Sequence, residues 1–384
     1  MPGSMQIETE PRSGAAGVRP KMERLPNVQI LRAIAAMMIV VHHCGIETAR
    51  LAAKSGGGPL FNEEPWGSGV PIFFAISGFI MVVTSAHSFG SPGAAFDFMR
   101  RRIIRIVPLY WLVTTVGLGA LLAMPSFMKV LPNDYGYIIS SYLFWPAMRL
   151  TGDVRPLATP GWTLNLEMFF YVVFAVGLLF PRRVGLPFLF ASLGLLVAAR
   201  VAGLFSGVVL NFWGDPIVLG FLSGAALGVV YNRGFRLSGR AAAALAIVSF
   251  AVLWQVDVSG PEDSLFARFA FAAPSAFVLA GFALGPQLDE RWRFWWPALI
   301  VGDASYSLYL VHEFVLRPIY LVWQKVIPDA ISLWLFIPLG FGVSLFVALT
   351  TYYCFEKPVT RWLNAKWRKR DPRPAAPQPM PARA

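Results

Sequence analysis

Apolar residues fill long uninterrupted stretches of this chain, and short polar segments separate the stretches. A helix needs about 20 consecutive apolar residues to cross the hydrocarbon core of a bilayer, and many of the stretches are about that long. The pattern therefore predicts an all-α integral membrane protein with about ten transmembrane helices. The predicted spans cover residues 28–45, 68–86, 103–124, 161–180, 184–205, 208–231, 241–257, 265–286, 297–322 and 331–355.

The composition agrees with this pattern. Hydrophobic residues make up 56% of the 384 residues and charged residues 14%, and the mean hydropathy is +0.57. A soluble globular domain keeps about a quarter of its residues charged, so most of this surface does not face water. The segment 135–146 is apolar but too short to span, so we interpret it as interfacial or re-entrant. The first 25 residues are polar, so no cleavable signal peptide is expected.

The basic residues indicate the orientation of the spans. Lys and Arg concentrate in alternate connections, and the connections between them hold fewer, with six such residues on the poorer side: Arg50, Lys54, Lys129, Arg149, Arg155 and Lys325. Because cytoplasmic loops carry the excess of basic residues, both termini are predicted to be cytoplasmic. The connection 125–160 is then the longest outer loop. The segment 1–26 is a polar cytoplasmic region, 27–363 is the membrane domain, and 364–384 is a basic, Pro- and Ala-rich tail expected to be disordered.

Charge and cysteine usage exclude other classes of protein. The net charge of +12 follows the membrane-flanking pattern, and no Cys/His finger spacing or basic-aromatic pattern is present, so no nucleic-acid partner is expected. The two cysteines, Cys44 and Cys354, are predicted near opposite faces of the membrane, which excludes a disulfide framework. No cluster with metal-ligand spacing is visible, so no metal is expected.

Ionisable residues inside the first span are candidates for function because a bilayer tolerates such groups reluctantly. Arg32 lies about one turn past the cytoplasmic boundary, and His43 follows eleven residues later. Eleven residues are three helical turns and about 16 Å, so the two side chains share one face at different depths. His42 points about 100° away. An isolated membrane histidine is more often a hydrogen-bonded structural residue, but His43 is not isolated.

The fourth span supplies a carboxylate at a matching depth. Glu167 lies about six residues inside the outer boundary, which matches the depth of His43 near the outer leaflet. A carboxylate beside an imidazole fixes its tautomer and raises its basicity, which a general base requires. Depth alone equally allows Glu167 to be a structural partner of Asn165, Tyr171 or a backbone group.

Further polar residues are expected as possible lining of the same cavity, namely Ser77, Tyr171, Ser305, Tyr306 and His312. The ninth span holds Ser305, Tyr306, Ser307, His312 and Glu313, and His312 falls in its outer half as a second imidazole. Helix packing is the stronger interpretation for its Ser-Tyr-Ser run. In the second span, close packing around Gly78 is a stronger interpretation than a catalytic role for Ser77, and no serine-nucleophile motif is present.

Two arginines at the cytoplasmic end of the third span are candidates for phosphate binding. Arg102 and Arg105 are three residues apart and therefore adjacent on one helix face. Guanidinium groups bind phosphates bidentately. Ordinary membrane anchoring or binding of anionic lipid head groups is the alternative.

These segments, in this order, resemble the membrane-bound acyltransferase family 3, the O-antigen and exopolysaccharide O-acetylase type. The resemblance covers about residues 25–363. The matching elements are Leu31-Arg32-Ala33-Ile34-Ala35-Ala36 with His43, Pro71-Ile72-Phe73-Phe74-Ala75-Ile76-Ser77-Gly78-Phe79, Arg102-Ile103-Ile104-Arg105 with Pro108-Leu109-Tyr110-Trp111, Trp162-Thr163-Leu164-Asn165-Leu166-Glu167, Ser305-Tyr306-Ser307-Leu308-Tyr309-Leu310-Val311-His312 and Phe355-Glu356-Lys357-Pro358.

The resemblance implies a ten-helix fold, acyl-CoA (commonly acetyl-CoA) as the donor and a carbohydrate or glycolipid hydroxyl as the acceptor. It implies that His43 is the catalytic base or an acyl relay, with Glu167 the glutamate of the fourth-span motif. It also implies that Arg102 and Arg105 lie at the CoA entrance, with Arg32 belonging to the same motif as His43. The expected location is the inner membrane, with no permanently bound cofactor.

The expected mechanism uses the different depths of these residues. The acyl-CoA phosphates rest near Arg102, Arg105 and Arg32, and His43 activates the acceptor hydroxyl at the outer side. Direct transfer and an acyl-histidine intermediate both stay open, as do the acceptor, the acyl chain and the oligomeric state. The main alternative is a transporter or flippase of a lipid-linked sugar, which would often show internal hydropathy repeats. No convincing repeat relates the two halves of this chain.

Overall fold

The computed structural model describes residues 25–123, 134–255, 265–289, 291–327 and 332–370. Within them the protein is helical and contains no strand, with one isolated bridge between Met148 and Val154. The predicted all-α class is confirmed. The polar segment before residue 25 and the tail after residue 370 lie outside the described residues.

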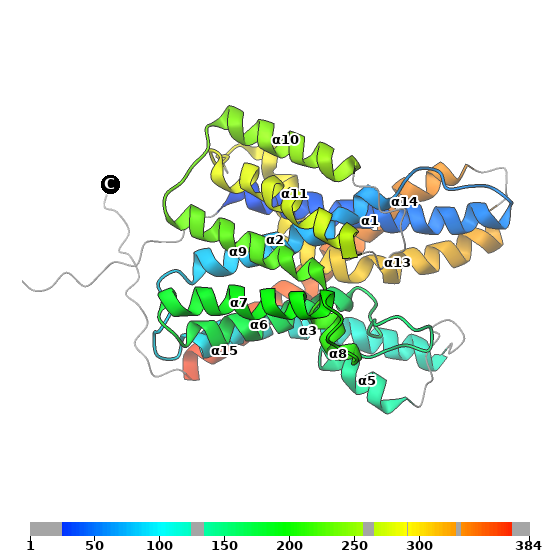
Figure 1. The fold of residues 1–384 in the computed structure, drawn as a ribbon. Helices are drawn as coiled ribbons and strands as arrows, with labels where there is room; N and C mark the ends of the chain where they lie inside the picture. The colour runs from blue at the N-terminus through cyan, green and yellow to red at the C-terminus, as the bar shows by residue number, and fades with distance from the viewer. Residues whose placement is uncertain (1–24, 124–133, 256–264, 290, 328–331, 371–384) are drawn as a thin grey trace, which may run out of the picture.

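The helices form one elongated bundle (Figure 1). In chain order they are α1 (Pro26–Lys54), α2 (Gly69–Thr84), α3 (Ala94–Ala123), α5 (Tyr135–Tyr142), α6 (Gly161–Leu178), α7 (Arg182–Val201), α8 (Val208–Trp213), α9 (Leu219–Asn232), α10 (Gly239–Gln255), α11 (Leu265–Leu284), α12 (Trp296–Asp303), α13 (Ser305–Val326), α14 (Phe336–Thr351) and α15 (Lys357–Arg370).

Length and hydropathy support a multi-pass membrane protein. Among the described residues, six helical segments are long and apolar enough to cross a bilayer, and the bent pair α12 and α13 adds a seventh if it is one span. Three shorter apolar helical segments cover Pro216–Asn232, Gly239–Gln255 and Ala270–Leu284. Each predicted span overlaps one of these segments, but the span predicted over 208–231 is divided between α8 and α9. The count of ten spans and the cytoplasmic position of both termini stay predictions.

Helix α5 occupies most of the short apolar segment 135–146. It has eight residues, too few to cross a bilayer as a helix. Two side chains of α3 fasten it, since Tyr110 Oη donates to the Ser141 carbonyl at 2.6 Å and Trp111 Nε1 donates to the Tyr142 carbonyl at 2.9 Å. The segment is therefore a short helix held against α3.

Glycines allow α2 and α9 to pack closely. A Cβ atom at Gly78 would overlap the Phe221 carbonyl of α9, and one at Gly224 would overlap the Ala75 carbonyl of α2. Small residues let membrane helices approach backbone to backbone. The predicted packing role of Gly78 is thereby confirmed.

A stack of aromatic rings joins α6 to this pair. Phe221 lies between Phe74 of α2 and Phe170 of α6, with ring centroids 4.2 and 4.5 Å apart. Phe170 is one turn from Glu167, and Phe74 is one turn from Ser77. The stack therefore fixes the relative positions of two helices that carry candidate site residues.

Two irregular points place polar groups inside the bundle. Helices α12 and α13 meet at a 64° bend around Ala304, so Ser305 begins a new helix inside the protein. Between α14 and α15 the chain makes a π-helical turn at Tyr352–Glu356, and Glu356 is 2% exposed. π-Helical turns are frequent at functional sites. Helices α1, α13 and α14 pack together beside these points (Figure 1).

Candidate active site

A cavity of 160 Å³ lies between α1, α2, α3, α6 and α13. It gathers eight of the ten residues singled out from the sequence. The eight are Arg32, Ser77, Arg102, Arg105, Glu167, Tyr171, Ser305 and Tyr306. The other two, His43 and His312, adjoin it through Tyr309, which lines the cavity and whose ring centroid is 6.0 Å from that of His312.

Arg32 is held at the bend between α12 and α13. Its Nη2 donates to Ser305 Oγ at 3.0 Å, and its Nη1 donates to Gln29 Oε1 at 3.2 Å. Gln29 Nε2 in turn donates to Asp303 Oδ1 at 2.6 Å. The bend therefore supplies the hydroxyl that orients the guanidinium in the cavity wall.

Arg105 is neutralised by Glu356, which the sequence places in the closing motif at residues 355–358. Its Nη1 forms an ion pair with Glu356 Oε1, and Ser307 Oγ donates to Glu356 Oε2 at 2.5 Å. Tyr306 donates to the Ile106 carbonyl at 2.7 Å, and the Arg105 guanidinium lies 5.8 Å from the Tyr306 ring centroid. Arg105 thus belongs to a connected polar network linking α3, α13 and the π-helical turn.

Arg102 differs from Arg105 in its partners. Its guanidinium lies 5.5 Å from the Phe98 ring centroid and 5.7 Å from that of Tyr171. Its Nε is buried without a hydrogen-bond partner, and the described part of the chain offers it no ion pair. A half-buried cation held against aromatic faces keeps its donors available for an anion.

Glu167 faces the cavity and is hydrogen-bonded there. Ser77 Oγ donates to its Oε1 at 2.5 Å, and Tyr171 Oη donates to the same oxygen. The structure thus shows the alternative in which Glu167 is a partner of Tyr171. It does not place Glu167 as the carboxylate of His43, because equal depth on two helices does not make two side chains neighbours.

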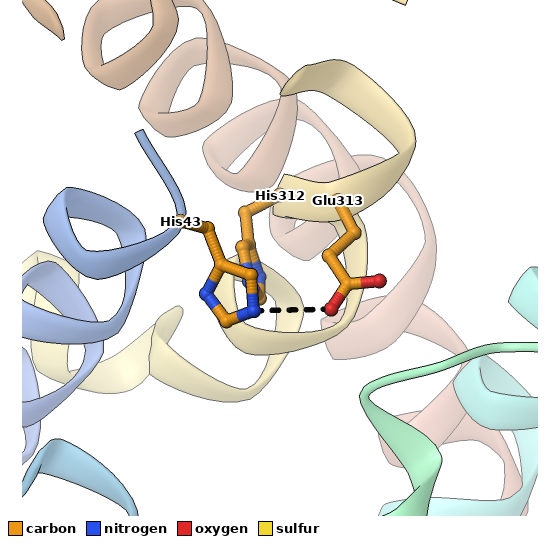
Figure 2. A group of neighbouring side chains, drawn as sticks. All are labelled: His43, His312 and Glu313. Carbon is orange, nitrogen blue, oxygen red and sulfur yellow. Dashed lines mark ion pairs between the residues drawn. The ribbon is translucent and has the colours of Figure 1, made fainter. Parts of the chain in front are cut away.

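The carboxylate beside His43 comes from α13. His43 Nε2 and Glu313 Oε1 are 3.2 Å apart, and the two side chains are 26% and 25% exposed (Figure 2). His43 Nδ1 is 2.9 Å from the Ile39 carbonyl, one turn back on α1, to which it donates. A proton therefore lies between Nε2 and the carboxylate. Glu313 falls within the predicted ninth span but has no role assigned from the sequence. Its ionisable side chain inside a span was the signal that could have identified it as functional.

His312 completes a cluster with this pair. Its ring centroid is 4.7 Å from that of His43, with the planes at 69°. Its Nδ1 lies 3.2 Å from the Leu308 carbonyl, and its Nε2 is buried with no hydrogen-bond partner. His42 is turned away, with Nδ1 2.9 Å from the Glu63 carbonyl. Of the four ring nitrogens of His43 and His312, three are therefore engaged, and one, His312 Nε2, has no partner among the described residues.

The cluster is also the group of the described residues that comes nearest to a metal site. The ligand atoms of His43, His312 and Glu313 lie within 4.8 Å of one another. Neighbouring ligands of a tetrahedral zinc ion are about 3.4 Å apart, given bonds of about 2.1 Å. The three atoms would have to move closer together to bind such an ion, and the expectation of a metal-free site stays a prediction.

Comparison with known proteins decides the family. A family model described as an acyltransferase domain, acyltransferase 3, matches residues 25–353. The chain belongs to the acyltransferase family 3. The matched range contains the cavity and the histidine cluster, and it ends just before Glu356. The protein is accordingly a multi-pass membrane acyltransferase.

Curated relatives carry names consistent with this family. The chain is 32% identical over 310 residues to the exopolysaccharide production protein ExoZ of Rhizobium meliloti (strain 1021), covering 77% of this chain and 89% of that protein. It is 26% identical over 330 residues to the acyltransferase MdmB of Streptomyces mycarofaciens, covering 78% and 80%. It is 24% identical over 349 residues to the O-acetyltransferase OatA of Staphylococcus aureus (strain NCTC 8325 / PS 47), covering 75% of this chain and half of that protein. No solved structure matches the chain.

Proposed function

We propose that this acyltransferase moves an acyl group, acetyl in the first instance, from cytoplasmic acyl-CoA to a hydroxyl of a carbohydrate or glycolipid at the outer side of the inner membrane. One observation carries the proposal. A cavity that presents the guanidinium of Arg102, unpaired among the described residues, is lined by Tyr309. Tyr309 adjoins His312, and His312 adjoins the His43–Glu313 pair, whose side chains are 26% and 25% exposed. Relatives named for exopolysaccharide production and O-acetyl transfer support the choice of acceptor and acyl group.

The donor end of the site is assigned from charge. Arg32, Arg102 and Arg105 bring three guanidinium groups to one cavity, and among the described residues only Arg105 has a carboxylate bonded to it. Phosphate oxygens of CoA complement such groups. In this proposal Arg102 binds phosphate directly. Arg105 stabilises the structure of the CoA entrance through its ion pair with Glu356.

The acceptor end is assigned from the histidine pair. A hydroxyl must lose its proton as it attacks the acyl carbon, and the His43–Glu313 pair is exposed enough to receive that hydroxyl. Glu313 replaces Glu167 as the group that orients His43. Glu167, bonded to Ser77 and Tyr171, is a polar wall residue of the donor cavity.

The test is acyl transfer by protein purified in detergent. Acetyl-CoA carrying a labelled acetyl group is incubated with pooled cell-envelope glycans, and both glycan label and released CoA thiol are measured. We expect label on the glycan with wild-type protein, and a loss of about 100- to 10,000-fold in kcat with His43→Gln. His87→Gln, at an exposed turn remote from the cavity, is the matched control and keeps wild-type rates.

The same assay separates the enzyme from a transporter of lipid-linked sugars. A transporter would neither bind acyl-CoA nor release CoA thiol. Failure of folded wild-type protein to bind any acyl-CoA would overturn the proposed function.

A further inference from the structure

The Nε2 atom of His312 is a buried nitrogen that has no hydrogen-bond partner in the part of the chain that the structure describes. The residue is 0% exposed, and its Nδ1–H donates to the Leu308 carbonyl one turn back. The ring then has its lone pair on Nε2, which meets no donor. Buried polar atoms are nearly always hydrogen-bonded, so a free one calls for an explanation.

His312 is a neighbour of both halves of the site. On one side Tyr309, a wall residue of the cavity, has its ring centroid 6.0 Å from that of His312. On the other side the His43 ring centroid is 4.7 Å away. Tyr309 is fixed by its hydroxyl, which donates to the Pro160 carbonyl at 2.9 Å. His312 therefore adjoins both a wall residue of the cavity assigned to the donor and the partly exposed His43–Glu313 pair.

His43 is less suited than His312 to form a bond with the acyl carbon. Its Nδ1 donates to a carbonyl, and its Nε2 is taken by Glu313 (Figure 2). A nucleophile needs a free lone pair, and within the described residues of this cluster only His312 Nε2 offers one. The His43–Glu313 pair is thus suited to accept a proton, and His312 is suited to act as a nucleophile.

We propose that His312 Nε2 carries the acyl group from the donor cavity to the acceptor, an inference that rests on the proposed function. In the first half-reaction Nε2 attacks the thioester carbonyl carbon, the C–S bond breaks, and the CoA thiolate leaves with its electron pair. His312 becomes an N-acylimidazolium whose Nδ1–H still donates to Leu308. The thiolate then takes a proton from water at the cytoplasmic side.

The second half-reaction regenerates the enzyme. The acceptor hydroxyl gives its proton to the Glu313 carboxylate of the pair, because both nitrogens of His43 already carry protons, and its oxygen attacks the acyl carbon. The C–N bond breaks, and its electron pair returns to His312 Nε2. The pair then releases the proton to water, so that donor and acceptor never have to meet in one chamber.

The experiment is isotope exchange without acceptor. Detergent-purified protein is mixed with unlabelled acetyl-CoA and tritiated free CoA, and the appearance of label in acetyl-CoA is followed. A covalent intermediate makes the first half-reaction reversible on its own, so wild-type protein exchanges the label and shows ping-pong kinetics in the full reaction. These two measurements need no variant.

Substitution assigns the intermediate to His312. His312→Gln and His312→Asn keep an amide near Nε2 and Nδ1 respectively, and neither is a nucleophile. We expect both to reduce exchange at least about 100-fold, while binding of acyl-CoA, measured directly, changes less than threefold and reports that the site is folded. The matched control His87→Gln exchanges as wild type does.

Three results would overturn the inference or its basis. Transfer to glycan by wild-type protein without any exchange means direct transfer, and it overturns the inference alone. Exchange that persists in both His312 variants does the same. A wild-type protein that neither exchanges, transfers nor binds acyl-CoA overturns the proposed function and the inference together.

Discussion

Single residues in this site are distinguished by their partners rather than by their type. Arg102 and Arg105 look equivalent in the sequence, yet Arg105 is paired with Glu356, and Arg102 stands against two aromatic rings with its Nε unbonded. His43 and His312 likewise differ in whether Nε2 is engaged. The two arginines therefore have different proposed roles, and so do the two histidines.

The two arginines should respond differently to removal. We expect Arg102→Ala to raise the KM for acyl-CoA by about 10- to 100-fold, the value of a lost hydrogen bond to a charged group. Arg101→Ala, an exposed neighbour outside the cavity, should leave KM unchanged. Initial rates at varied acyl-CoA concentration give both values. An Arg102→Ala enzyme with wild-type KM would contradict the assigned phosphate contact.

The carboxylate beside His43 should matter for chemistry and not for donor binding. Glu313→Gln keeps the shape of the side chain but removes its charge, so we expect kcat to fall about 100- to 10,000-fold while the KM for acyl-CoA stays unchanged. Steady-state kinetics with a saturating acceptor measure this. Glu64→Gln, at an exposed position on another segment, is the control. A small kcat effect would mean that His43 works without its carboxylate.

At the scale of elements, close helix contacts and broken helices build the cavity. The glycine contacts between α2 and α9 and the Phe74–Phe221–Phe170 stack hold Ser77 and Glu167 at bonding distance. The bend before α13 brings Ser305 to Arg32, and the π-helical turn brings Glu356 to Arg105. Regular helices carry most of the polar side chains of the site, and the interruptions add Ser305 and Glu356.

The glycine contact gives a prediction about stability. Gly78→Ala would place a methyl group against the Phe221 carbonyl, and overpacking of this kind costs about 1–3 kcal/mol. We expect a lower Tm for the detergent-solubilised protein. Gly119→Ala in α3 meets nothing within 4 Å and should leave Tm unchanged or slightly raised. Equal Tm values for the two variants would contradict the close packing of α2 and α9.

At the scale of the whole molecule, the mechanism depends on which end of the bundle faces the cytoplasm. The arginines lie toward the N-terminal end of α1, and His43 lies about 16 Å farther along the same helix. The predicted orientation places acyl-CoA and the arginines on the same side. The reverse orientation would turn the donor cavity away from its substrate.

Cysteine labelling tests this orientation. In a background without Cys44 and Cys354, Leu150→Cys and Phe235→Cys place thiols at exposed positions of opposite loops. We expect a membrane-impermeant maleimide to label Leu150→Cys once the outer barrier is opened, and Phe235→Cys only after the inner membrane is permeabilised. The opposite pattern would contradict the assigned donor side.

The sequence by itself determined the helical class, the approximate position of the apolar helical segments along the chain and eight residues of the cavity wall. These follow from local physics, since apolar length decides whether a segment suits a bilayer and the rise per residue decides depth along a helix. Arg32 and His43 could be placed on one face for the same reason.

Only the tertiary structure decided which side chains meet. Helix rotation and lateral neighbours depend on packing between distant segments, such as the glycine contacts of α2 with α9 and the bend before α13. For that reason Glu313 rather than Glu167 lies beside His43, and Glu356 reaches Arg105 across 251 positions of sequence. The free nitrogen of His312 likewise exists only because packing buries it between two groups that it does not bond.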